Sequence, residues 1–551
     1  MAEKSEAKMV PTLGLTGVTV NAMALIAPGA FLWITFVVQA GYAYPSGMAM
    51  WSGIFAALVL AYATAISYSE LAKLFPGAGS SYLFAEQAFL NHSAHFRFAR
   101  IAKFIIGWAS HLYYWVYPGV MVATMGVMVG YIVGTIAPST MNAGIPGPVF
   151  MALIAVIFSF AVAYIAHQGV SGSTNVNIAI NAIQIIALLF FSALAISYRM
   201  SHPAGSTGLA LDGTTKTLAY SFTGDTPAHP TGMSVILPHS FNYVMLQATV
   251  AILLLVGFES VTALGEEAQN PKKDIPRGVL LSLTIQCLFC YLIEYFAANY
   301  FLNQGYTLAD AAGSGAPLGD MMVLVGTWLF GSYAAGRAFM LIQAATVFLA
   351  LIGTTLSCLS TGARVTYAMG KDDEVPSHFG LLHGKRLTPH RAIWTLATIS
   401  AVIGVLTVVT YLGGTTPAPL EAKYHNLWYG FGIFPPELYA KLPNSLVITT
   451  LVSNFGTFLL YMLTCVVAIV AFREHHSFSG FKHLFVPLFG LVANLVCMLF
   501  YLVGPFTVAG MSVKEPYIAL GACVLWGLYG AFFFLTSSKR KGKTVLVEKA
   551  A

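Results

Sequence analysis

Long apolar stretches alternate with polar connections along the whole chain. Twelve stretches are long enough to cross a bilayer, which requires about 20 apolar residues per helix. They cover residues 15–41, 47–74, 102–136, 146–166, 176–199, 241–265, 277–301, 337–369, 391–412, 445–472, 483–503 and 515–537. We therefore expect an all-α integral membrane protein with twelve transmembrane helices. The polar connections are too short to hold a soluble domain.

Two of these stretches are interrupted by glycine. One contains Ala27-Pro28-Gly29-Ala30 and the other Val256-Gly257-Phe258-Glu259-Ser260. A helix is broken at membrane depth only where the freed backbone groups are buried in protein or line a cavity. Matching breaks in two halves of a chain point to the binding site of a secondary transporter. We expect helices one and six to be broken at these positions.

The order of these features predicts two five-helix halves, each opening with its broken helix, and two peripheral helices after them. The expected divisions are an N-terminal tail (1–14), a first half (15–199), an outer loop (200–240), a second half (241–472) that includes another outer loop (413–444), helices eleven and twelve (473–537) and a C-terminal tail (538–551).

Composition and charge support a membrane protein and set its orientation. The chain is 57% hydrophobic and only 9% charged. With the N-terminus inside, 21 of the 27 Lys and Arg residues fall on the inner side, as the positive-inside rule requires. We expect a multi-pass protein of the cell membrane, in bacteria the cytoplasmic membrane, with both termini cytoplasmic. The topology explains the net charge of +6, so nucleic acid is not expected as a partner. The run Lys539-Arg540-Lys541 is expected to meet anionic lipid headgroups.

Three parts of the chain carry a family resemblance. They are Ser69-Glu70-Leu71-Ala72 with Phe75–Tyr82, then Gly257–Ser260 with Glu266–Arg277, and finally Ala363–Asp372 with Val375-Pro376 and Thr388-Pro389. In this order they resemble the amino acid–polyamine–organocation (APC) superfamily, in its amino acid permease branch. The resemblance implies a LeuT-like fold with a 5+5 inverted repeat. It also implies a permease or exchanger that moves amino acids or related amines by alternating access.

The two breaks are the expected substrate site. The N-terminus of a half-helix attracts an anionic group, so the backbone around Ala27, Gly29, Ala30 and Phe31 would hold a substrate carboxylate. Carbonyl groups of the second break, at Val256 and Gly257, would accept hydrogen bonds from the substrate ammonium, with Phe258 as an aromatic wall.

The first break departs from the pattern of the family. Members usually carry Gly-Ser-Gly or Gly-Ala-Gly there, but this chain has Ala27-Pro28-Gly29. Proline lacks an N–H group, so one carboxylate donor is missing. An exchanger of polyamines or other decarboxylated amines is therefore the alternative to an amino acid permease.

Two acidic residues are candidates for coupling or gating. Glu259 lies at the second break and Glu294 in helix seven. A carboxylate within the membrane is costly unless it is paired, protonated or in contact with water, which suits proton coupling or recognition of a cation. The alternative for Glu259 is a structural brace of helix six. On helix three, His111 and Tyr114 share a face, which could hold an ammonium by cation–π attraction or could simply pack.

The coupling ion stays open at this stage. In several proton-coupled relatives a lysine lies on helix five, where this chain places Gln184. Glutamine cannot titrate, so exchange or proton coupling through Glu259 is favoured over the lysine mechanism. Sodium remains an alternative through hydroxyl groups of helix eight, such as Thr354.

Other classes of protein find less support in the chain. We find no motif for a metal, a cofactor or an enzymatic nucleophile. We therefore expect no cofactor and no enzymatic activity. A membrane sensor of amino acids that does not transport them stays open, and so does a homo-oligomer. The expected partners are a small-molecule substrate and the lipid bilayer.

Overall fold

The computed structural model describes residues 10–26, 35–36, 39–40, 49–136, 147–211, 213–220, 231–312, 314, 316–409, 443–508 and 511–547. Nearly all of its regular structure is helical. The first half contains α1 (Leu15–Ile26), α3 (Met50–Leu74), α4 (Ser81–Leu90), η2 (Phe96–Phe98), α5 (Ala99–Tyr114), α6 (Tyr117–Ile136), α7 (Gly147–His167) and α8 (Val170–Ser201).

The second half begins with an interrupted helix. It contains α10 (Phe241–Leu255), η4 (Phe258–Leu264), α11 (Pro271–Leu283), the π-helix η5 (Thr284–Tyr291), α12 (Leu292–Phe301), α13 (Leu308–Ala312), α14 (Pro317–Phe330), α15 (Tyr333–Lys371), η6 (Ser377–Gly380), α16 (His390–Val409) and α19 (Ser445–Arg473). The π-helix η7 (Phe481–Phe485), α20 (Val486–Thr507) and α21 (Lys514–Lys541) follow.

Ten helical segments of the described chain are long and apolar enough to cross a membrane. Some of these segments contain several successive helices. Phe96–Val133 contains η2, α5 and most of α6, and Pro271–Phe301 contains α11, η5 and α12. α1, α10 and α14 are also apolar but shorter. The chain is therefore a multi-pass membrane protein. α21 has the smallest buried share of the ten segments and α20 the next smallest, so both are peripheral.

The helices pack in two groups. In one group α3 contacts α10 and α11, while α1 contacts α11 and η4. In the other group α16 contacts α6 and α7, and α15 contacts all three of them. α1 also contacts α8 and α15. The short helix α1 therefore belongs to the first group and lies where that group meets α15 of the second.

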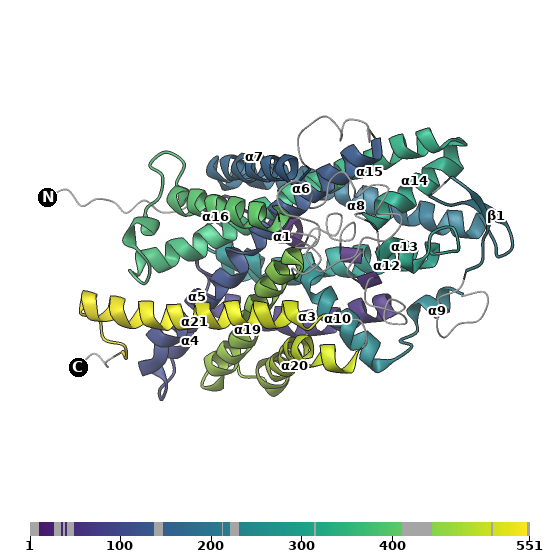
Figure 1. The fold of residues 1–551 in the computed structure, drawn as a ribbon. Coiled ribbons are helices and arrows are strands. Elements are labelled where there is room, and N and C mark those ends of the chain that lie inside the picture. The colour runs from purple at the N-terminus through teal and green to yellow at the C-terminus, as the bar shows by residue number, and fades with distance from the viewer. Residues whose placement is uncertain are drawn as a thin grey trace.

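The two ends of the molecule differ in structure. The hairpin β1 (Thr207–Leu209) and β2 (Thr215–Thr217) lies with α9 (Gly232–Ile236), α13 and α14 at one end, and α4 with the C-terminal end of α21 lies at the other (Figure 1). The described part of the expected outer loop 200–240 contains this hairpin and α9. The β-branched threonines favour strands, and Gly213 turns the chain at φ +78°. Residues 410–442, which include most of the expected outer loop 413–444, lie outside the described chain.

Candidate functional site

The break in the second half is formed by two residues. α10 ends at Leu255, Val256 is extended with φ −72° and ψ 142°, and Gly257 has φ +131°. A Cβ atom on Gly257 would lie 2.9 Å from Leu25 Cβ and 3.0 Å from the backbone nitrogen of Ile26. Only glycine suits both the left-handed conformation and this close approach of α1.

The end of α1 faces this break and is capped by side chains. The last carbonyls of a helix have no partner within the helix. Here the amide of Gln286 donates to the carbonyl of Met23 at 3.0 Å, and Tyr291 donates to the carbonyl of Ile26 at 2.9 Å. Thr354 of α15 donates to the carbonyl of Ala24 at 3.0 Å. Side chains from the π-helix η5 and from α15 therefore satisfy carbonyls at the end of the described part of α1.

The residues expected to hold a carboxylate follow directly after this end. Ala27, Gly29, Ala30 and Phe31 lie outside the described residues. Their role stays a prediction, as does the break they were expected to form.

Glu259 lies two residues after Gly257 and is completely buried. Its Oε2 atom accepts hydrogen bonds from the hydroxyl of Tyr461 at 2.7 Å and from the backbone N–H of Gly257 at 3.0 Å. Its Oε1 atom accepts one from the hydroxyl of Tyr114 at 3.3 Å. No cation contributes to these three contacts, so the carboxylate is held by neutral dipoles alone. Such a group is suited to bind a mobile cation or a proton.

Aromatic rings surround the carboxylate. The ring centroid of Phe258 lies 5.3 Å from that of Tyr461 and 6.1 Å from that of Tyr68. Tyr68 is held in place by the hydroxyls of Ser81 at 2.8 Å and Thr464 at 3.2 Å. Rings from α3, η4 and α19 thus meet at one buried acid, with Tyr114 arriving from α5. Acid and rings together form the kind of site that binds an alkylammonium group.

The sequence identified part of this cluster. Gly257, Phe258, Glu259 and Tyr114 were expected at the site and lie together. Tyr461 and Tyr68 were missed, although Tyr461 belongs to a polar row at helical spacing on its helix. That row consists of Asn454, Thr457, Tyr461 and Thr464, all buried.

The other expected residues lie apart from these hydrogen bonds. Both ring nitrogens of buried His111 lack a partner among the described residues, and its ring stacks on Trp115 at 4.3 Å and packs near Trp526 of α21. Glu294 on α12 is also buried, and both carboxylate oxygens lack a hydrogen-bond partner within the described chain. Gln184 is buried on α8.

A polar row on α8 faces α1. Asn181 accepts a hydrogen bond from Gln286 at 2.8 Å and donates to the carbonyl of Val20 at 3.2 Å. Asn177 donates to Asn21 at 2.9 Å. This row connects α1 to α8. Among the described residues, no group of acids, histidines and cysteines is arranged to hold a metal ion.

A buried ion pair joins the segment after η4 to α15. The guanidinium of Arg364 donates to Glu267 through Nε at 2.9 Å and through Nη2 at 3.0 Å. The backbone of Glu267 accepts a hydrogen bond from Leu13 N–H at 2.9 Å, and the N–H of Gln269 donates to Leu13 at 2.8 Å. The segment before α1, the segment after η4 and α15 are therefore closed against one another.

Comparison with known proteins gives consistent matches. A family model described as amino acid permease matches residues 11–529. The branched-chain amino acid permease BcaP of Bacillus subtilis is 26% identical over 422 residues, which cover 74% of this chain and 77% of that protein. The low-affinity putrescine importer PlaP of Escherichia coli is 24% identical over 405 residues, or 72% and 75% of the two chains. The methylthioribose transporter of B. subtilis is 24% identical over 413 residues, or 73% and 76%.

Proposed function

The chain belongs to the amino acid permease family and is a secondary transporter for amino acids or amines, and we propose that Glu259 binds the ammonium group of its substrate. The observation that carries this proposal is the buried carboxylate at a broken helix, held by three neutral donors and lined by aromatic rings. A substrate ammonium would supply the positive charge that the described residues do not.

The class of substrate depends on the first break. An amino acid would also need donors for its carboxylate around Gly29, where Pro28 supplies no N–H. A decarboxylated amine needs only Glu259 and the rings. One relative is named for branched-chain amino acids and another for putrescine, so both substrate classes occur among proteins similar to this chain. We keep the amino acid as first candidate and the amine as second.

Twelve helices in a 5+5 inverted repeat would explain the architecture. The ten long segments, together with the interrupted helices α1 and α10–η4, account for twelve. Corresponding helices of the two proposed halves also fall into the same packing groups. The first helix of each half, α1 and α10–η4, occurs in one group. The fourth helix of each half, α7 and α16, occurs in the other.

Alternating access then requires the two groups to separate at each face in turn. We assign the pair of Glu267 and Arg364 to closure of the inner face, since it joins the segment after η4 to α15. The excess of Lys and Arg supports a cytoplasmic position for this end and for both termini. The paired backbone of Leu13 belongs to the same closure.

Coupling is assigned to carboxylates rather than to a lysine. Glu259 would exchange its proton or cation with the substrate, and Glu294 is a second buried acid that could carry a proton. Gln184 cannot titrate and is assigned a positioning role. No catalytic step is part of this proposal.

Thermal stabilisation of the purified protein tests the site directly. A ligand that binds only the folded form raises its stability by mass action. We expect stabilisation by at least one amino acid or its decarboxylated amine, and loss of that stabilisation in Glu259→Gln. Stabilisation by amines alone would select the second candidate. An amine that stabilises Glu259→Gln as well as the wild type would overturn the assignment of Glu259.

A further inference from the structure

The C-terminal tail folds back onto the end of α15. Gly542 ends α21 with φ +63°, and the N–H of Lys543 bonds to the carbonyl of Ser538 at 3.0 Å. This glycine stop reverses the chain. We call residues 538–547, the last turn of α21 and the tail after it, the strap. Its end reaches η2, where the N–H of Val547 donates to the carbonyl of Arg97 at 3.0 Å.

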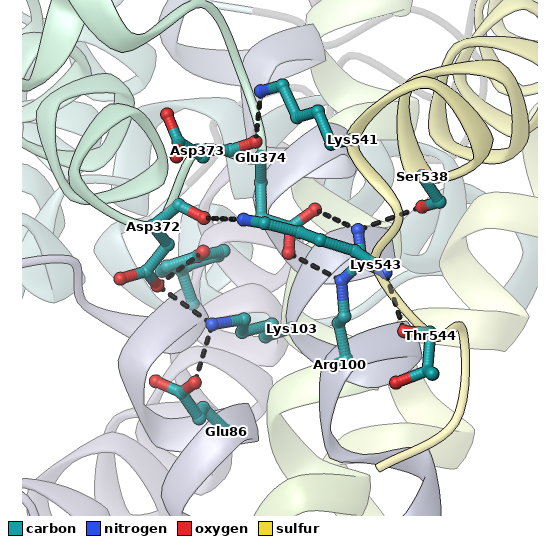
Figure 2. Close-up of polar contacts among 11 residues, drawn as sticks. Glu86, Arg100, Lys103, Asp372, Asp373, Glu374, Ser538, Lys541, Lys543 and Thr544 are labelled. Atoms are coloured by element: carbon teal, nitrogen blue, oxygen red, sulfur yellow. Dashed lines mark hydrogen bonds and ion pairs between the residues drawn. The ribbon is translucent and has the colours of Figure 1, made fainter.

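The strap binds an acidic turn, defined as Asp372, Asp373 and Glu374 (Figure 2). Lys541 donates to the carbonyl of Asp373 and Lys543 to the carbonyl of Asp372, each at 2.7 Å. The turn follows directly after α15, where the helix dipole is negative and carbonyls lack partners. Three acids at this end would destabilise it. The lysines of the strap supply both the missing donors and the missing positive charge.

Arg100 of α5 connects the turn with the strap. Its guanidinium donates to Glu374 at 2.7 and 3.0 Å, and also to the hydroxyl of Ser538 at 2.8 Å and the carbonyl of Thr544 at 2.7 Å. Lys103 adds bonds to Glu86 and to Asp372 at 2.8 Å. Figure 2 shows these contacts converging from α4, α5, α15 and the strap.

The contacts of the strap are the outer part of this cluster. The side chain of Glu374 is only 5% exposed and that of Arg100 only 11%, whereas Lys541 is exposed and Lys543 partly exposed. Exposed ionic contacts are weak, so the lysines can leave while Arg100 stays paired with Glu374. Lys539 and Arg540 beside them are exposed as well. Four basic residues in the last turn of an apolar helix and just after it are attracted by an anionic membrane surface.

We propose that the strap is a releasable restraint on the cytoplasmic end of α15, and that anionic lipid headgroups compete with the acidic turn for its lysines. α15 also carries Arg364, about two helical turns before the acidic turn. Release of the strap removes one restraint on this end of the helix, beside those from Arg100 and Lys103, and weakens closure by Arg364 and Glu267. The membrane surface thereby favours opening of the inner face.

Hydrogen exchange of the full chain in nanodiscs tests the proposal without any substrate. The relevant peptides cover 10–26, 264–270 and 369–376, which contain the backbone pair of Leu13 and the acidic turn. In neutral phosphatidylcholine, Lys541→Ala/Lys543→Ala should exchange about fivefold faster than the wild type in all three, as expected from two lost surface contacts. Addition of phosphatidylglycerol should accelerate the wild type and leave the variant unchanged.

The matched control is Lys539→Ala/Arg540→Ala, which removes the same charge from the strap but leaves the two lysines that bond to the acidic turn. It should exchange like the wild type in neutral lipid. Lys541→Gln/Lys543→Gln should repeat the alanine result if charge is responsible. Equal exchange of wild type and Lys541→Ala/Lys543→Ala would overturn the restraint. Acceleration confined to 369–376 would overturn the link to inner closure. A wild type indifferent to phosphatidylglycerol would overturn lipid competition. None of these results depends on Glu259.

Discussion

At the scale of single residues, the site rests on one glycine and one acid. Gly257 provides the backbone conformation that ends α10, and Glu259 accepts hydrogen bonds through both oxygens just beyond it. Both could be predicted from the sequence, because a glycine and an acid so close together inside an apolar stretch indicate a broken helix. Tyr461 and Tyr68 could not, because their meeting with Glu259 depends on how α19 and α3 pack against η4.

Replacement of Gly257 by alanine should destabilise the protein. The new Cβ would stand 2.9 Å from Leu25 Cβ in a left-handed conformation, for a cost of roughly 2 to 4 kcal/mol. Thermal unfolding in detergent measures the change. Gly521→Ala is the control, because nothing lies within 4 Å of its new Cβ. Equal unfolding temperatures of the two variants would contradict this interpretation of the break.

The two tyrosines that bond to Glu259 should differ in importance. The hydroxyl of Tyr461 is 2.7 Å from the carboxylate and that of Tyr114 is 3.3 Å away. Tyr461→Phe should weaken ligand binding by about tenfold, as for a hydrogen bond to a charged group, and Tyr114→Phe by less. Titration of ligand-induced thermal stabilisation gives both affinities. The reverse order would show that the bound state rearranges these contacts.

At the scale of elements, α15 connects several parts of the molecule that are distant in the sequence. Through Thr354 it caps α1, through Arg364 it holds the segment after η4, and its end carries the acidic turn. The sequence predicted this helix and the motif after it, but not these partners. They lie up to 330 residues away in the chain.

Loss of the charge on Glu267 should weaken the inner closure. Glu267→Gln leaves Arg364 buried and unpaired, which costs about 3 to 5 kcal/mol. Arg364→Lys should be milder, since it keeps the charge but loses the two-pronged geometry. Thermal unfolding and exchange at Leu13 report the two effects. Lys73→Gln breaks an ion pair with Glu70 in which the lysine side chain is 47% exposed. It should change the unfolding temperature little.

Asp320, in the connection between α12 and α15, should make the stability of the protein depend on pH. The hydroxyls of Tyr131 and Tyr306 donate to Asp320 at 2.7 and 3.0 Å, yet burial raises the pKa of Asp320 from 3.8 to about 6. The folded protein therefore binds this proton more tightly than the unfolded chain. Its contribution to stability is complete below pH 3.8 and is lost as pH rises through about 6.

Asp320→Asn provides the reference without this proton. As pH falls from 7 to 4, the free energy of unfolding of the wild type should rise relative to that of the variant. The gain should stay below about 3 kcal/mol, because the side chain is partly exposed and solvent screens it. Unfolding measured across pH gives the difference, and parallel pH profiles would contradict it.

At the scale of the whole molecule, hydropathy alone predicted most of the architecture. The long helices of the described chain fall on the predicted apolar stretches because backbone groups in lipid must pair within their own segment. The hairpin β1–β2 and α9 were missed, since outside the bilayer weaker preferences decide. The family resemblance is confirmed by the match over 11–529. The contact of the run Lys539-Arg540-Lys541 with lipid stays a prediction, and in this structure Lys541 and Lys543 bond to the acidic turn.

Solute counterflow in proteoliposomes tests the central claim most directly, with a branched-chain amino acid and putrescine as probes. The account predicts saturable counterflow of at least one of them by the wild type. Glu259→Gln should slow it by about tenfold or more, since a charged contact is lost. The exposed acid Glu474 serves as control, and Glu474→Gln should transport normally. Counterflow by Glu259→Gln at the wild-type rate would contradict the account.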